Sequence, residues 1–320
     1  MNEPIVDILI PTYKPGQEFE ELLLGLLRQT YPVRQILIVN TDESRWNPKF
    51  ERLVPNLCVE HIDQRNFDHG GTRKAMAASS DADLLMFMTQ DAIPANAELV
   101  EKLVMQFSLP QVKAAYARQL PKKGCSVLEA YTRSFNYPRE SDIKDYGDLP
   151  QLWLNTFFCS NVCAMYDRKV YEELGGFVSR TIFNEDMIYA AGLIEAGYSI
   201  AYAAEAMVYH SHNYGCIAQM KRNFDLGVSQ AQYPDIFRKY PSEGEGIRMV
   251  KQTAAHVWEI RRPWLLVPLF FQSGFKYLGY QLGKHYRVLP RGIILRCTSN
   301  KTWWRFRKKR KKKGYSSSAG

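Results

Sequence analysis

Short apolar runs alternate with segments of helical periodicity over the first 118 residues of the chain. Near-continuous apolar runs are typical of buried strands, and apolar positions spaced three and four residues apart are typical of helices. The predicted strands are 6–11, 35–39, 58–62, 83–88 and 112–117, and the predicted helices are 18–29, 71–80 and 95–107. Apolar strands that alternate with helices indicate a mostly parallel central sheet flanked by helices, an α/β fold.

The pattern loosens after residue 120 into a loop-rich region that extends to about residue 150. Glycines close two of the helices predicted beyond it. The later predictions are a strand at 157–165, helices at 169–174 and 185–196, short strands at 200–204 and 207–210, and mainly helix from 218 onward.

Polar residues follow three of the predicted strands directly. They are Pro11-Thr12-Tyr13, Asn40-Thr41-Asp42 and Thr89-Gln90-Asp91. In a parallel sheet the carboxyl ends of the strands share one edge, where ligands gather. We therefore expect these three segments to be neighbours.

Two acidic motifs each allow a structural and a chemical interpretation. Asp91 could bind a divalent cation at the sheet edge, or it could be a turn or helix-cap residue. In Asn184-Glu185-Asp186, Asn184 suits a helix N-cap and the acids suit a first helical turn. A carboxylate at a rigid helix start also suits a general base that deprotonates a hydroxyl. Neither motif decides the function alone.

The order and spacing of five motifs is more informative. The series resembles family 2 glycosyltransferases of the GT-A fold, in particular bacterial rhamnosyltransferases, over about residues 5 to 215. The pair formed by residues 67–73 and 89–91 is its more specific part. The motifs are Ile8-Leu-Ile-Pro-Thr-Tyr13, Ile36-Leu-Ile-Val-Asn-Thr-Asp42, Phe67-Asp-His-Gly-Gly-Thr-Arg73, Thr89-Gln-Asp91 and Phe183-Asn-Glu-Asp186.

The resemblance implies a binding site for a nucleotide-sugar donor. Its residues would be Pro11, Thr12 and Tyr13 around the nucleobase, Asp42 near the base or ribose, Gln90 near the donor ribose, and Arg73 at the diphosphate. The family commonly has Asp-Asp or Asp-x-Gly-Ser after the second strand, whereas this chain has Asn-Thr-Asp-Glu-Ser. Either Asp42 or Glu43 could therefore contact the nucleotide.

The resemblance also implies a metal ion and a catalytic base. Asp91 would hold Mg²⁺ or Mn²⁺ against the diphosphate, and His210 or His212 would complete that site. Thr89 replaces the first Asp of the family's Asp-x-Asp, so the metal would depend on one carboxylate and the substrate phosphates. Asp186 would be the base, with Glu185 beside it.

The acceptor side is less defined. Asn161 corresponds to the floor of the acceptor site in this family, but it could equally be a buried, hydrogen-bonded Asn. Trp153, in a predicted loop, is the preferred sugar-stacking residue. His69 could be a contact residue or a packing residue beside Gly70-Gly71.

The charge distribution indicates that the C-terminal part of the chain binds a membrane surface. Of 42 basic and 33 acidic residues, 18 basic residues and only Glu259 lie in 248–320. An apolar segment at 263–271 and Trp303-Trp304 precede the basic run 307–313. The apolar segment is too short and interrupted for a bilayer span, so we expect binding to an anionic membrane surface, the alternative being a solvated tail. No nucleic-acid recognition motif accompanies the charge.

The compartment is expected to be the cytosol, with the protein peripheral on the inner face of the cell membrane. The chain start, Met-Asn-Glu-Pro, lacks the features of a secretory signal. The six cysteines show no CxxC or zinc spacing, so we expect reduced thiols.

The resemblance implies an inverting enzyme that moves L-rhamnose from dTDP-β-L-rhamnose to a hydroxyl of a glycan, and the basic C-terminal region favours a lipid-linked acceptor. Alternatives are a UDP-hexose donor such as UDP-galactose, a nucleotidyltransferase, and a nucleic-acid-binding protein. The single glycine in 11–16 disfavours the nucleotidyltransferase, and nucleic-acid binding leaves the first 215 residues unexplained. The expected parts are a GT-A catalytic domain at 1–215 (donor half 1–118, acceptor half 119–215), a helical membrane-associating region at 216–300, and a basic tail at 301–320.

Overall fold

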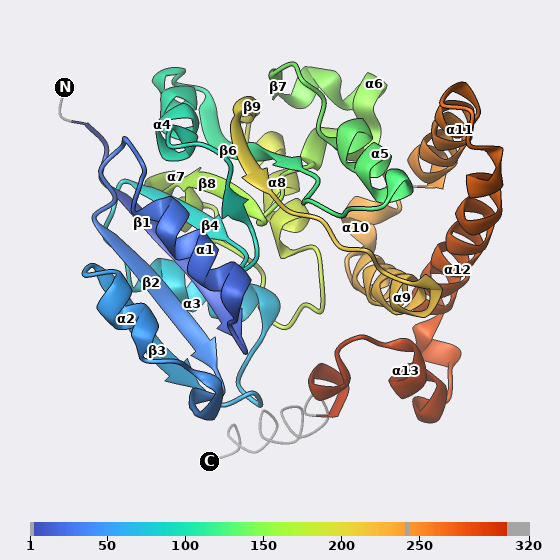
Figure 1. Cartoon of the computed structure of the whole chain (residues 1–320), viewed down its shortest axis with the longest axis horizontal. Coiled ribbons are helices and arrows are strands. Elements are labelled where there is room, and N and C mark those ends of the chain that lie inside the picture. The colour runs from blue at the N-terminus through green and yellow to red at the C-terminus, as the bar shows by residue number, and fades with distance from the viewer. Residues whose placement is uncertain (1–2, 241–242, 306–320) are drawn as a thin grey trace, which may run out of the picture.

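The computed structural model describes residues 3–240 and 243–305, and a mixed nine-stranded sheet forms its centre (Figure 1). The strand order is β3-β2-β1-β4-β8-β6-β9-β5, and β7 pairs with β9. The strands are β1 (Val6–Tyr13), β2 (Gln35–Thr41), β3 (Leu57–Ile62), β4 (Leu84–Met88), β5 (Ile93–Pro94), β6 (Val112–Leu120), β7 (Asp142–Lys144), β8 (Cys163–Asp167) and β9 (Ser199–Tyr209).

Helices cover the sheet and make up the C-terminal part of the chain. They are α1 (Gln17–Leu26), α2 (Lys49–Leu53), α3 (His69–Ala78), α4 (Leu99–Val104), α5 (Val127–Asn136), α6 (Leu149–Leu152), α7 (Arg168–Glu173), α8 (Glu185–Glu195), α9 (Cys216–Gln232), α10 (Pro234–Phe237), α11 (Glu243–Glu259), α12 (Leu266–Lys284) and α13 (Arg291–Cys297). Helices α9, α11, α12 and α13 lie to one side of the sheet (Figure 1).

The predicted α/β fold is confirmed, but the sheet is less parallel than predicted. Strands β3, β2, β1 and β4 are parallel neighbours. Strand β8 runs antiparallel between β4 and β6, whereas β6 and β9 are parallel. Apolar patterning reports burial on both faces and not strand direction, so the sequence could not reveal the reversed strand.

Two predicted strand boundaries are wrong. Phe157, in the apolar pair Phe157-Phe158, is the last residue of a 3-10 helix (Trp153–Phe157), and Phe158 follows that helix. Strand β8 begins only at Cys163. These two rings pack edge-on against Tyr240 and Tyr116 respectively, so their apolar character reflects core packing. The two short strands predicted at 200–204 and 207–210 form the single strand β9, whose register against β6 shifts between Ala117 and Arg118.

Both faces of the sheet are buried. Ile8 and Ile10 of β1 join a core cluster with residues of α1 and α4, and Leu9 joins a second cluster with residues of α3 and α8. Alternate residues of a strand point to opposite faces, so these helices cover opposite sides of the sheet. This arrangement leaves the strand ends as the accessible edge.

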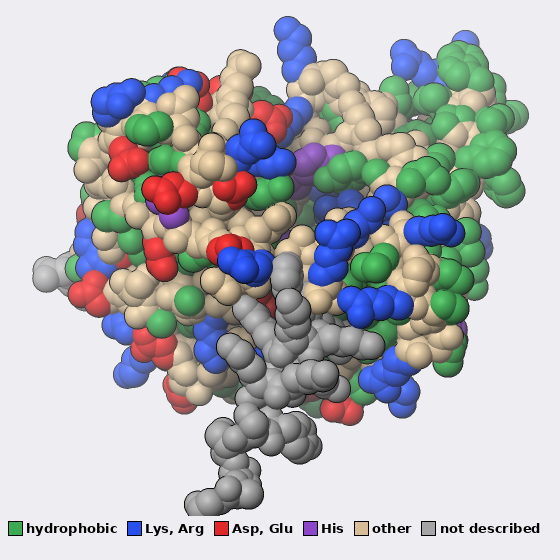
Figure 2. All heavy atoms as spheres, turned by 90° about the horizontal axis from the view of Figure 1, so that it is seen from below, with side chains coloured by type: hydrophobic (Ala, Val, Ile, Leu, Met, Phe, Trp, Pro, Cys, Tyr) green, Lys and Arg blue, Asp and Glu red, His purple; other side chains and the backbone are tan. Residues whose placement is uncertain are grey.

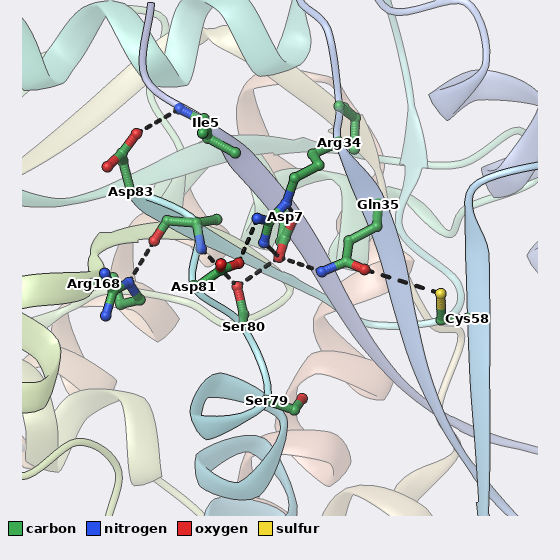
Figure 3. Close-up of polar contacts among 12 residues, drawn as sticks. Ile5, Asp7, Arg34, Gln35, Cys58, Ser79, Ser80, Asp81, Asp83 and Arg168 are labelled. Atoms are coloured by element: carbon green, nitrogen blue, oxygen red, sulfur yellow. Dashed lines mark hydrogen bonds and ion pairs between the residues drawn. The ribbon is translucent and has the colours of Figure 1, made fainter.

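The amino end of β1 is fixed by the buried carboxylate of Asp7 (Figure 3). It accepts hydrogen bonds from Arg34 Nε (2.9 Å), Gln35 Nε2 (2.8 Å) and Ser80 Oγ (2.6 Å). Burial by itself raises the pKa of Asp7, but these donors lower the pKa overall. The carboxylate thus joins β1 to β2 and to the turn between α3 and β4.

Helices α9 and α12 are in backbone contact through three glycines. A Cβ on Gly227 would lie 2.3 Å from the carbonyl oxygen of Tyr280, and one on Gly279 would lie 2.1 Å from that of Met220. A Cβ on Gly283 would lie 2.1 Å from the carbonyl oxygen of Phe224.

The helices of 3–240 and 243–305 include none with the length and apolarity needed to cross a bilayer. Residues 301–305 are helical, and the rest of the expected basic tail, 306–320, lies outside the described residues.

We predict that Gly283→Ala destabilises the protein by roughly 1–3 kcal/mol, because the added methyl group must displace helix backbone. Gly274→Ala is the matched control, since a Cβ at this position of the same helix meets no described atom within 4 Å. That control should stabilise the helix by about 0.5–1 kcal/mol. Urea unfolding measures both, and similar free energies of unfolding for the two variants would contradict the close contact.

Candidate active site

The ends of β1, β2 and β4 are joined by side-chain hydrogen bonds at one edge of the sheet. Gln90 accepts from the backbone N–H of Tyr13 (2.8 Å) and donates to its carbonyl oxygen (3.0 Å). Thr12 Oγ1 donates to Asn40 Oδ1 (3.0 Å). The parallel pairing of these strands places the expected donor-binding segments next to one another.

A cavity lies beyond the end of β2. Its lining residues are Asp42, Glu43, Ser44, His61, Ile62, Asp63 and Gln64. Asp42 has a left-handed backbone (φ 75°) and accepts a hydrogen bond from Ser44 Oγ (2.6 Å). Asn40 Nδ2 donates to the Asp42 carbonyl (3.2 Å) and lies 3.0 Å from His61 Nδ1. Both Asp42 and Glu43 therefore line the cavity. His61 lines it too, although no sequence pattern marked His61 as a site residue.

Asp91, His210 and His212 form a cluster whose ligand atoms all lie within 4.8 Å of one another. Asp91 Oδ2 is 3.1 Å from His212 Nε2 and 3.5 Å from His210 Nε2. The cluster forms because β5 pairs antiparallel with β9, with Ile93 opposite Tyr209. The two-residue strand brings together segments that are more than a hundred residues apart in the chain.

Gln119 fixes the orientation of His210. Its Oε1 accepts from His210 Nδ1 (2.9 Å) and from Arg133 Nη1 (2.6 Å), while its Nε2 donates to Ser160 Oγ (3.1 Å) and to the Tyr137 hydroxyl. Because an amide oxygen only accepts, the His210 proton is on Nδ1 and the Nε2 lone pair faces the cluster. The sequence gives no signal for Gln119 or Arg133.

The cluster fits a divalent cation. Burial opposes ionisation of Asp91, but the neighbouring imidazoles of His210 and His212 hold the pKa of its carboxyl well below the usual range. One carboxylate oxygen and two imidazole nitrogens form a donor set suited to Mn²⁺.

Helix α3 begins in close contact with the segment that leads into α8. Asp68 caps α3 by accepting from Gly71 N (2.7 Å), and it also accepts from Arg180 N (3.0 Å). A Cβ on Gly70 would lie 1.9 Å from the Val178 carbonyl oxygen, so only glycine allows this approach. The motif at 67–73 thus joins two helices.

The contact between these helices contains a buried ion pair. Arg73 Nη1 lies 3.1 Å from Glu185 Oε1 and donates to the His69 carbonyl (3.1 Å), and both charged side chains are buried. Burial opposes ionisation of Glu185, but Arg73 lowers its pKa overall. Burial also lowers the pKa of the His69 ring.

Asp186 is a suitable proton acceptor. Its half-buried carboxylate accepts from Asn161 N (3.1 Å) and from Met187 N (2.8 Å). Burial, followed by the neighbouring charge of Glu185, raises the pKa of Asp186 to about 7. Asn161 itself is buried, and its Oδ1 accepts from Tyr166 (2.9 Å).

Asn184 stands at the predicted N-cap position of α8, but its backbone is left-handed (φ 64°). Its side chain makes no capping hydrogen bond among the described residues, so the favourable cap expected from its residue type is absent. Trp153 is 54% exposed in its 3-10 helix.

Arg222 of α9 is a site residue that the sequence did not reveal. Its guanidinium lies over the rings of Phe183 (5.5 Å) and Tyr214 (5.1 Å), and Tyr214 stacks on His212 (4.8 Å). Arg222 is exposed and has no ion pair within the described part of the chain. Its guanidinium therefore lies between the cluster of Asp91, His210 and His212 and the segment leading into α8.

Comparisons with known proteins show similarity to glycosyltransferases. The model of glycosyl transferase family 2 matches residues 7–175. Over 303 residues the chain is 40% identical to the O-antigen chain rhamnosyltransferase RfbN of Salmonella typhimurium, covering 93% of this chain and 96% of RfbN. It is also 37% identical to the O-antigen chain rhamnosyltransferase WbaN of Salmonella anatum, covering 94% and 96%.

The chain belongs to glycosyl transferase family 2. The family expected from the motifs is therefore confirmed. Among solved structures, it resembles the mannosyltransferase PcManGT from Pyrobaculum calidifontis, solved in complex with GDP-Man and Mn²⁺. The TM-score is 0.55 at 15% identity, over 94% of this chain and 88% of that one. At this identity the likeness shows that the family 2 chain has a GT-A-like fold.

We predict that Gln119→Leu weakens Mn²⁺ binding about 10- to 100-fold, because His210 loses the acceptor that fixes its proton on Nδ1. Titration of the purified protein with Mn²⁺, followed by electron paramagnetic resonance, measures the Kd without turnover. His61→Gln is the control, since this imidazole lies in the cavity beyond β2. An unchanged Mn²⁺ Kd in Gln119→Leu, or equal loss in the control, would refute the role of Gln119.

Proposed function

We propose that this protein transfers L-rhamnose from dTDP-β-L-rhamnose to a hydroxyl of a lipid-linked glycan during synthesis of a cell-surface polysaccharide. The observation that carries the proposal is the likeness over nearly the full chain to two O-antigen chain rhamnosyltransferases. The site supports it by offering a residue for each step of glycosyl transfer.

The donor nucleotide is assigned to the edge formed by β1, β2 and β4. Pro11, Thr12 and Tyr13 would line the base, and Asp42 and Gln90 would contact the base or ribose. This assignment is supported by the hydrogen bonds that hold Tyr13 to Gln90 and by the cavity that Asp42 lines.

The diphosphate is assigned to the cluster of Asp91, His210 and His212 and to Arg222. The three cluster residues would hold Mg²⁺ or Mn²⁺, which supplies positive charge to the departing diphosphate when bound. Arg73 was expected at the diphosphate, but its guanidinium is paired with Glu185. We therefore assign the direct phosphate contact to Arg222, which has no ion pair among the described residues and whose guanidinium can form paired hydrogen bonds with phosphate oxygens.

Asp186 is assigned as the catalytic base. It removes the proton of the acceptor hydroxyl, whose oxygen attacks the anomeric carbon as the bond from that carbon to the diphosphate breaks. A single displacement inverts the anomeric centre, so a β-L-rhamnosyl donor gives an α-L-rhamnoside. Glu185 is held by Arg73, and its negative charge keeps Asp186 basic. Asn161 positions Asp186, and Trp153 is proposed as a sugar-stacking surface of the acceptor site.

Membrane binding is assigned to the C-terminal part of the chain, which would lie on the inner face of the cell membrane. The excess of basic residues in 248–320 favours an anionic lipid surface.

A screen of nucleotide sugars tests the donor. We expect dTDP-β-L-rhamnose, with Mn²⁺ or Mg²⁺, to raise the melting temperature and to be hydrolysed slowly without acceptor. UDP-galactose and UDP-glucose are the comparison donors. Stabilisation and hydrolysis by a UDP-hexose, with none by dTDP-rhamnose, would overturn the rhamnosyl assignment and leave the family membership intact.

We predict that Asp186→Asn lowers kcat by roughly two to four powers of ten, because the amide cannot accept the hydroxyl proton. Donor affinity should be unchanged. In the wild type, kcat/KM should rise with pH through about 7, since the base acts only when its carboxyl is ionised. The exposed Asp235→Asn is the matched control. Near-normal turnover in Asp186→Asn with donor still bound would assign the base elsewhere.

A further inference from the structure

An apolar groove lies between α5, α9, α11 and α12, outside the site assigned to the donor. Its walls include Leu128, Leu226, Val250, Leu269, Phe270 and Tyr277. Apolar side chains gather at this side of the molecule (Figure 2). Four helices contribute residues to the groove wall. Its predominantly apolar lining suits a hydrocarbon ligand.

Exposed aromatic residues lie on the helices beside the groove. Trp258, Trp264 and Phe270 are 69%, 64% and 73% exposed, and the exposed cations Arg261 and Arg262 lie between the two tryptophans in the chain. Tryptophan beside arginine is typical of the boundary between lipid tails and headgroups. These residues favour a lipid surface next to the groove.

Lys276 places one cation in the groove wall. Its side chain is half-buried, and within residues 3–240 and 243–305 it makes no hydrogen bond or ion pair. Burial lowers the pKa of Lys276, which reflects the cost of leaving an ammonium group without a partner. The nearby carboxylate of Glu129 is already paired with Arg133 (2.7 Å). An anionic group of a ligand would give Lys276 its missing partner.

A chain of polar contacts joins this groove to the catalytic edge of the sheet. Glu129 lines the groove and binds Arg133, which donates to Gln119 (2.6 Å). Gln119 in turn accepts from His210 of the cluster (2.9 Å). Three side-chain contacts therefore separate the groove wall from the residues assigned to the diphosphate.

We propose that the groove binds the hydrocarbon chain of the lipid that carries the acceptor glycan, with the lipid phosphate against Lys276. This inference rests on the proposed function, because it concerns the acceptor of the same reaction. The chain would enter from the side of Trp258 and Trp264, and the phosphate-linked glycan would extend past α5 toward Asp186.

Binding of farnesyl phosphate tests the groove without turnover, with farnesol and inorganic phosphate as separate probes. Ile247 lines the groove and is 58% exposed, so Ile247→Asp should disturb the ligand more than the fold. The matched control is Val288→Asp, at a position that is 81% exposed and outside the groove lining.

We expect Ile247→Asp to weaken farnesyl phosphate binding at least about tenfold, equivalent to ~1.4 kcal/mol, and Val288→Asp to leave it unchanged. Lys276→Gln should weaken binding of farnesyl phosphate but not of farnesol. Equal binding by wild type and Ile247→Asp, or saturation by inorganic phosphate alone, would overturn the proposal. A dimeric wild type that becomes monomeric in Ile247→Asp would overturn it in favour of a second copy of the chain.

Hydrolysis of the donor is measured on the same samples. Intact hydrolysis with no farnesyl phosphate binding refutes the groove alone. Binding without any hydrolysis of dTDP-rhamnose refutes the proposed function and leaves the lipid site standing.

Discussion

The ion pair between Arg73 and Glu185 is the constraint on which the arrangement of the catalytic side depends. Both charges are withdrawn from water, and removal of one partner from such a pair typically costs about 3–5 kcal/mol. The pair joins α3, whose start packs on the Val178 carbonyl, to the first turn of α8. The pair also gives two adjacent carboxyl groups opposite pKa shifts. Glu185 keeps its charge next to Arg73, and burial together with this charge raises the pKa of Asp186 to about 7.

The opposite side of the site depends on strand pairing. His210 reaches Asp91 because the two-residue strand β5 pairs with the end of β9. Gln119, at the end of β6, then orients His210 and passes a second contact to Arg133 of α5. The half of the sheet with mixed strand directions, through β5 and β9, thus places two imidazoles beside a carboxylate that follows β4.

The sequence correctly predicted that the ends of β1, β2 and β4 lie together, because apolar strands and the polar residues that follow them are local patterns. The grouping of Asp91 with either His210 or His212 was expected only from the family resemblance, and the structure brings both histidines to Asp91. Gln119 and Arg222 were not predicted, since a single polar residue inside a strand or helix has no local signature. The pair Phe157-Phe158 gave a false strand start because burial in an aromatic core and burial in a sheet produce the same apolar run.

The glycine contact between α9 and α12 has a consequence for the reach of the enzyme. With carbonyl groups against Gly279 and Gly283, α12 has little freedom to slide or roll on α9, and only residues 213–215 separate α9 from His212. If the aromatic residues of α11 and α12 rest on lipid, the catalytic edge stands at one height above the membrane. The distance between the catalytic edge and the membrane would then select the acceptor: the enzyme would glycosylate only those hydroxyl groups that the growing glycan presents at that distance from its lipid anchor.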